Sequence, residues 1–111
     1  MSRDTAEILK EVLALPAEAR AALAEAQAAV AWYRERSVRA AEAFVSEIEK
    51  AIEGISQAPR RWPPFEGGCR RFPLLRFPYL VIYREKAQSV DVLAIAHGRR
   101  RPGYWRTRGR P

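Results

Sequence analysis

The chain has 111 residues, of which 48% are hydrophobic and 30% are charged. This length suits one small domain and excludes two independent ones, and the composition excludes wholesale disorder. The formal net charge is +7. Residues 1–55 hold seven Lys/Arg and ten Asp/Glu, a net of −3, whereas residues 56–111 hold thirteen and three, a net of +10. The second half is therefore a cationic surface that suits nucleic acid, an acidic protein or a phosphate-bearing ligand.

The same sequence argues against a membrane or a secreted protein. No apolar run approaches the roughly 20 residues of a membrane helix, and acids stand where a signal peptide needs an apolar stretch. We therefore expect a cytoplasmic protein that does not bind a membrane. The single cysteine, Cys69, excludes an internal disulfide framework and a multi-cysteine zinc site. We expect no metal and no cofactor.

A first short helix is predicted over residues 4–14. Asp4 is a suitable N-cap, and Glu7 stands three residues later, as a capping box requires. Three apolar residues share one face at helical spacing, namely Ile8, Val12 and Leu15. Pro16 ends this helix and can open the next one.

Two longer helices follow. Residues 17–36 carry an apolar seam with a period near 3.5, made of Ala19, Leu23, Ala26, Val30 and Tyr33. Because alanine dominates this helix, we expect it to pack close to its neighbour. A turn is predicted at Ser37–Arg39, and a third helix over residues 40–57. Its buried stripe is expected to comprise Phe44, Ile48, Ile52 and Ile55.

The second half of the chain indicates strands. Prolines and glycines mark Pro59–Gly68 as a loop. Strands are predicted at Cys69–Leu75, Tyr79–Arg84 and Val90–His97, the last apolar on both faces after Asp91. Residues 98–111 read as a basic tail that is too polar to form core. Helices followed by strands predict an α+β domain.

Several residues have a plain structural interpretation. Trp32 and Tyr33 are expected in the core, and Trp62 and Phe65 are expected to cover it beneath the proline-rich loop. A lone histidine that ends a buried strand, such as His97, more often bonds a neighbouring backbone group than acts chemically.

Four pieces of the sequence, in this order, carry a family resemblance. They are Ala29–Tyr33 (AVAWY), Ser37–Phe44, Arg76–Tyr79 (RFPY) and Val92–Trp105 (VLAIAHGRRRPGYW). With them, residues 26–105 resemble the RelE/ParE superfamily of toxins from bacterial type II toxin–antitoxin (plasmid stabilisation) modules. The last piece is typical of the ParE-like branch. The resemblance implies an α+β fold with a helical hairpin packed on a small three-stranded antiparallel sheet, here over residues 26–111.

The beginning of the chain resembles something else. Ile8–Glu25 is similar to a short antitoxin-like family, the addiction module components, through Leu15, Pro16 and Arg20. Residues 1–25 are therefore interpreted as an antitoxin-like helical segment joined to a toxin that lacks its first strand. A genuine fusion, a deletion scar and a degenerate locus all remain open.

The ParE-like resemblance implies a toxin that acts by binding a target, in that family DNA gyrase, and that is neutralised by a cognate antitoxin. Such a toxin needs a presented surface and no catalytic residue. The predicted target-binding residues are His97, Arg99, Arg100, Arg101, Tyr104, Trp105 and Arg106. A secondary basic surface is predicted on the sheet, at Arg71, Arg76 and Arg84.

One alternative is a ribosome-dependent mRNA endoribonuclease like the RelE branch. Cleavage needs cations for the scissile phosphate and an acid–base pair. The residues that could serve are Arg71, His97, Arg99 and Tyr104. However, Leu80 follows Tyr79 where the RNA-cutting members carry an arginine. The set is partial, so the resemblance favours a binding toxin over an enzyme and leaves catalytic residues unassigned.

A second alternative is a non-toxic, fused or degenerate interaction module. An unpaired sheet edge invites a partner strand, so a homodimer through that edge or through the alanine-rich helix is also compatible with the sequence.

Overall fold

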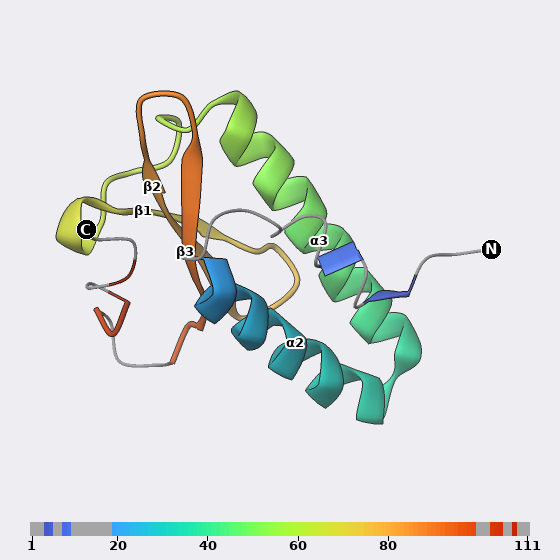
Figure 1. Ribbon diagram of the computed structural model, residues 1–111. Coiled ribbons are helices and arrows are strands. Elements are labelled where there is room, and N and C mark those ends of the chain that lie inside the picture. Colours follow the sequence, from blue (N-terminus) through green and yellow to red (C-terminus); the bar gives the residue numbers. More distant parts are fainter. Residues whose placement is uncertain (1–3, 6–7, 10–18, 100–102, 106–107, 109–111) are drawn as a thin grey trace.

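The computed structural model describes residues 4, 5, 8, 9, 19–99, 103–105 and 108 (Figure 1). Its elements, in chain order, are α2 (Ala19–Arg36), α3 (Val38–Gln57), the short 3-10 turn η1 (Glu66–Gly68), β1 (Arg70–Pro73), β2 (Tyr79–Glu85) and β3 (Val90–His97). The strands form one antiparallel sheet in the order β1-β2-β3. The expected α+β fold, a helical hairpin on a three-stranded antiparallel sheet, is therefore confirmed.

The two long helices are joined by a single residue. Ser37 has extended backbone dihedrals (φ −165°, ψ 118°), and its hydroxyl accepts a hydrogen bond of 3.1 Å from the amide of Ala40. Such a cap satisfies one of the free amides at a helix start. The predicted turn at Ser37–Arg39 is therefore too long, because α3 already begins at Val38.

The described residues of the N-terminal segment are helical at Thr5, Ile8 and Leu9. The amide of Ile8 donates to the carbonyl of Asp4 at 3.1 Å, one helical turn back, and the Thr5 hydroxyl accepts a hydrogen bond from Arg34 of α2. Leu9, which the predicted apolar face omitted, is 1% exposed and belongs to the core. The remaining residues of that predicted face, Val12 and Leu15, lie outside the described residues.

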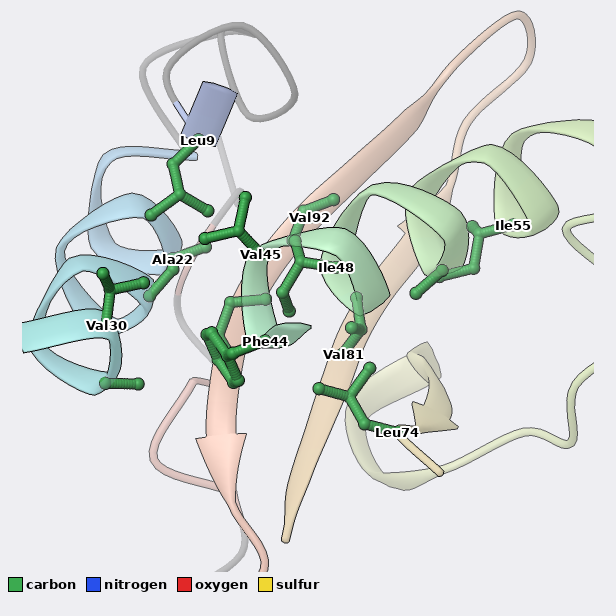
Figure 2. Close-up of a cluster of buried hydrophobic side chains, with 14 of the residues drawn as sticks. Leu9, Ala22, Val30, Phe44, Val45, Ile48, Ile55, Leu74, Val81 and Val92 are labelled. Carbon is green, nitrogen blue, oxygen red and sulfur yellow. The ribbon is translucent and has the colours of Figure 1, made fainter. Parts of the chain in front are cut away.

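The main core lies between the two helices and one face of the sheet, as Figure 2 shows. Alanines of α2 allow this helix to approach β3 and α3 closely, and four of them are buried: Ala19, Ala22, Ala26 and Ala29. From α3, the side chains of Phe44, Ile48 and Ile55 are fully buried. The predicted stripe is inaccurate at Ile52, which is only half-buried, because Ala51 and Val45 occupy the innermost positions instead.

The opposite face of the sheet carries a second, smaller core. Its buried members are Cys69, Ile82, Leu93, Ala94, Ala96 and Trp105. Trp105 is 2% exposed, and its ring stacks on Phe65 with centroids 5.7 Å apart. The prediction that residues 98–111 form no core is therefore wrong at Trp105. The position expected for Phe65 is confirmed, because it covers this core from the proline-rich loop.

The two ends of β1 are set by local hydrogen bonds and by glycine backbone angles. The turn after β1 is fixed by Glu47 of α3, whose carboxylate accepts from the amide of Leu75 (2.9 Å) and from the amide and Nε of Arg76 (3.3 and 3.2 Å). β1 therefore ends at Pro73, earlier than the predicted Leu75. Entry into β1 depends on Gly67 and Gly68, whose φ angles of 71° and 74° are costly for other residues.

Candidate functional site

His97 ends β3 beside the first residue of β2. Its ring meets the ring of Tyr79 edge-on, with centroids 5.1 Å apart, and its Nδ1 accepts a hydrogen bond of 3.1 Å from the amide of Arg99. The backbone bond expected of this histidine is thus present. Arg99 itself is exposed. The other predicted arginines of this surface, Arg100, Arg101 and Arg106, lie outside the described residues.

A pocket of about 460 Å³ opens next to His97, between α2 and the ends of β2 and β3. Its lining is largely aromatic or small, and comprises Glu25, Ala28, Ala29, Trp32, Tyr33, Pro78, Tyr79, Ile95 and His97. Burial raises the pKa of Tyr33 and of Tyr79 above the usual 10.0, and the proximity of Tyr79 raises that of Tyr33 further. Both phenols therefore stay neutral at physiological pH.

Trp32 does not lie in the core, contrary to the sequence prediction. Its side chain is 52% exposed, and the guanidinium of Arg36, one helical turn later, lies 3.6 Å from the ring centroid. The buried face of α2 runs through its alanines and Val30, which turns position 32 outward. Tyr33 packs as expected, against Phe44 and Phe77.

The two aromatic residues of the predicted contact surface are covered to different degrees. The ring of Trp105 is enclosed beneath the sheet, so it presents no contact area in this structure. Tyr104 is half-buried, and its hydroxyl donates a hydrogen bond of 2.6 Å to Glu25 Oε2.

Glu25 is the central polar residue of this region, and it was not among the residues predicted from the sequence. Its Oε1 accepts from the amide of Ile95 at 3.1 Å and from Arg108 Nη1 at 2.9 Å. Arg108 Nη1 also donates to the carbonyl of Leu93 at 3.1 Å. The available signal was position: Glu25 stands beside the seam residue Ala26, so its carboxylate lies at the margin of the face that packs on the sheet.

The predicted secondary basic surface divides into exposed and structural residues. Arg71 is exposed on the face of the sheet opposite the helices, with its guanidinium 4.7 Å from the centroid of Phe65. Arg76 is bound by Glu47. Arg84 donates to the carbonyls of Arg108 and Gly67, at 3.1 Å each. Arg76 and Arg84 therefore hold turns and the C-terminal residues in place.

The residues that a ribonuclease would need are distributed over two faces of the sheet. Arg71 pairs with Ile82, which belongs to the smaller core. His97 pairs with Tyr79, which packs against the main core on the helical side. The sheet therefore lies between the cation Arg71 and the candidate base His97.

The described residues hold one cysteine and no cluster of side chains that could bind a metal ion. Cys69 is buried, and the Arg84 guanidinium donates to its sulfur at 3.5 Å. Within the same residues, no helix is long and apolar enough to cross a membrane.

Comparison with known proteins agrees with this architecture. Residues 19–102 match the family model described as the ParE toxin of the type II toxin–antitoxin system, parDE. Two curated relatives, both named Toxin ParE2, come from Mycobacterium tuberculosis strains CDC 1551 / Oshkosh and H37Rv. Each is 33% identical over 55 residues, a stretch that covers 50% of this chain and 52% of the relative. The match thus spans about half the length of these relatives.

Proposed function

The chain belongs to the ParE toxin family of type II toxin–antitoxin systems, and we propose that it acts as a toxin that binds and inhibits DNA gyrase. A cognate antitoxin would neutralise it. The antitoxin-like nature of residues 1–25 is part of this proposal, as is the boundary to the toxin domain at residue 26.

The observation that carries a binding mechanism is the separation of Arg71 from His97 by the sheet. General acid–base catalysis and phosphate stabilisation require the base and the cations at one place. Of the candidate cations, Arg99 follows His97 closely, whereas Arg71 lies across the sheet, so the set is divided. Leu80, at the position where RNA-cutting relatives carry arginine, packs against the smaller core and supplies neither. A binding toxin needs no such assembly.

The proposed contact surface begins where β3 ends. Arg99 is exposed directly after the strand, and Arg100 and Arg101 follow it in sequence. Arginine binds carboxylates and phosphates bidentately and is common among residues that dominate protein interfaces. We assign the first contact with the target to these three arginines, and a neighbouring role to His97 and to the exposed Trp32 across the pocket.

Induced expression of the intact chain, scored by viable count together with a DNA-damage reporter, tests the proposal. Gyrase poisoning predicts cell death with the reporter on. Death with the reporter off would contradict gyrase as the target and direct the search to mRNA cleavage. Survival would contradict toxicity and favour a non-toxic interaction module.

A further inference from the structure

The outer edge of β3 is covered by side chains instead of by a strand. In the sheet that the structure describes, β3 pairs with β2 alone. On its other side, the amide of Ile95 donates to Glu25 Oε1 at 3.1 Å, and the carbonyl of Leu93 accepts from Arg108 Nη1 at 3.1 Å. These are a donor and an acceptor that a neighbouring strand would otherwise use.

The two covering side chains bind one another. Glu25 and Arg108 form an ion pair of 2.9 Å, with side chains that are 15% and 24% exposed. The hydroxyl of Tyr104 adds a bond of 2.6 Å to the second carboxylate oxygen. Hydrogen bonds between ionised partners are shorter and stronger than neutral ones, particularly where water is partly excluded. One carboxylate thus joins α2, β3 and the C-terminal residues.

The strand beneath has the burial and the composition of a strand that pairs readily. Asp91 through Ala96 are all buried, and the stretch is rich in β-branched and small apolar residues. Open edges of such strands are templates for association, and proteins block them with charged side chains and bulges. β3 is blocked by charged side chains. Its pairing with β2 passes from Ala94 to Val92 and leaves Leu93 as a bulge, and the carbonyl of Leu93 accepts a hydrogen bond from Arg108.

We propose that Glu25 and Arg108 form a latch that closes the edge of β3, and that this edge pairs with β3 of a second copy of the chain when the latch opens. The second copy is favoured because the edge is self-complementary. With a two-fold axis through Ala94, the Ile95 amide of each copy meets the Leu93 carbonyl of the other, which is the antiparallel pattern around a non-hydrogen-bonded pair.

The test compares Glu25→Ala with a matched variant, Glu35→Ala, which removes an exposed glutamate from the same helix. Sedimentation over a range of concentrations measures mass, and the exchange rate of the Ile95 amide, followed by NMR, reports on the edge. We expect the wild type and Glu35→Ala to be monomeric at every concentration. Glu25→Ala should exchange Ile95 about tenfold faster or more when dilute, and should dimerise when concentrated.

A cross-link locates the contact. Facing residues of a non-hydrogen-bonded pair have Cα atoms about 4.5 Å apart, within disulfide range. In a Cys69→Ala background, Ala94→Cys should therefore form a dimer-linking disulfide with Glu25→Ala and none with Glu25 intact.

Three results would overturn the proposal. The first is a cross-link through Ala94→Cys when Glu25 is intact. The second is a Glu25→Ala variant whose Ile95 exchange rate is unchanged, and the third is a Glu25→Ala variant that exchanges faster but stays monomeric. If Glu25→Ala loses its helical circular dichroism, Arg108→Ala decides by its mass in sedimentation and by the cross-link through position 94. That variant frees the Leu93 carbonyl and keeps the bonds from Tyr104 and Ile95 to Glu25.

Discussion

The hydroxyl of Tyr83 donates a hydrogen bond of 2.5 Å to the backbone carbonyl of Pro59. This bond links the middle of β2 to Pro59, two residues after the end of α3, so it fixes where the helical half of the chain turns toward the sheet. Tyr83 is fully buried in the main core. Its hydroxyl therefore has to find a partner inside the protein, and the carbonyl of Pro59 is that partner.

Alkaline pH is expected to destabilise the fold through this tyrosine. Burial raises the pKa of Tyr83 above 10.0, with Glu85 raising it and Arg70 lowering it. The folded state therefore favours the neutral phenol, so its contribution is fully present below pH 10 and is lost as the pH rises further. Melting temperature, measured from about pH 9 to 11, should fall, and should fall less in Tyr83→Phe. Equal slopes in the two proteins would contradict this assignment.

Two of the isoleucines of α3 provide a matched test of the core. Ile48 is fully buried, whereas Ile52 is half-buried. Ile48→Ala should lower the free energy of unfolding by about 2–5 kcal/mol, because it leaves a cavity in a closed core. Ile52→Ala removes the same atoms and should cost less. Denaturant unfolding measures both, and an equal or reversed order would show that the helix faces are assigned incorrectly.

The turn between β1 and β2 depends on Glu47. Its carboxylate, with an 11% exposed side chain, accepts from two backbone amides and from the Arg76 guanidinium. Glu47→Ala leaves the Leu75 amide without its acceptor and should lower the free energy of unfolding by about 1–3 kcal/mol. Glu42→Ala, on an exposed position of the same helix, is the control. If Glu47→Ala is as stable as that control, the prediction is wrong, and water replaces the carboxylate with no change in the free energy of unfolding.

Periodicity predicted the regular elements well, because a helix or strand is a local property of the sequence. Apolar spacing located α2 and α3, and the β-branched run Val90–His97 was placed with its observed bounds. Single side chains were harder. The prediction placed Trp32 in the core. In the structure its ring lies on the helix surface, where it packs against the guanidinium of Arg36 one turn later.

Long-range contacts of the C-terminal residues could not be predicted from the sequence. Trp105 stands in a run of arginines and glycines, and only its distant contact with Phe65 explains its burial. Glu25 looks like an ordinary surface acid of a helix. Its role depends on Tyr104 and Arg108, which lie about eighty positions away in sequence and reach it only in the folded chain.

The arginines after β3 are expected to carry toxicity. Replacing Arg99, Arg100 and Arg101 together by alanine should restore viable counts, since these cations supply the proposed contact with the target. The control removes the same charge elsewhere, at the exposed Arg39, Arg60 and Arg61. Both proteins should keep the wild-type melting temperature to within a few degrees. A fully toxic Arg99–Arg101 variant would contradict the proposed surface.

Inhibition of purified DNA gyrase by the purified chain tests whether gyrase is the target. DNA supercoiling by gyrase is followed with the wild type, with the variant lacking Arg99, Arg100 and Arg101, and with the charge-matched control. We expect supercoiling to stop with the wild type and the control, and to continue with the Arg99–Arg101 variant. Normal supercoiling in the presence of a wild-type chain that kills cells would contradict this expectation, and would place the target elsewhere.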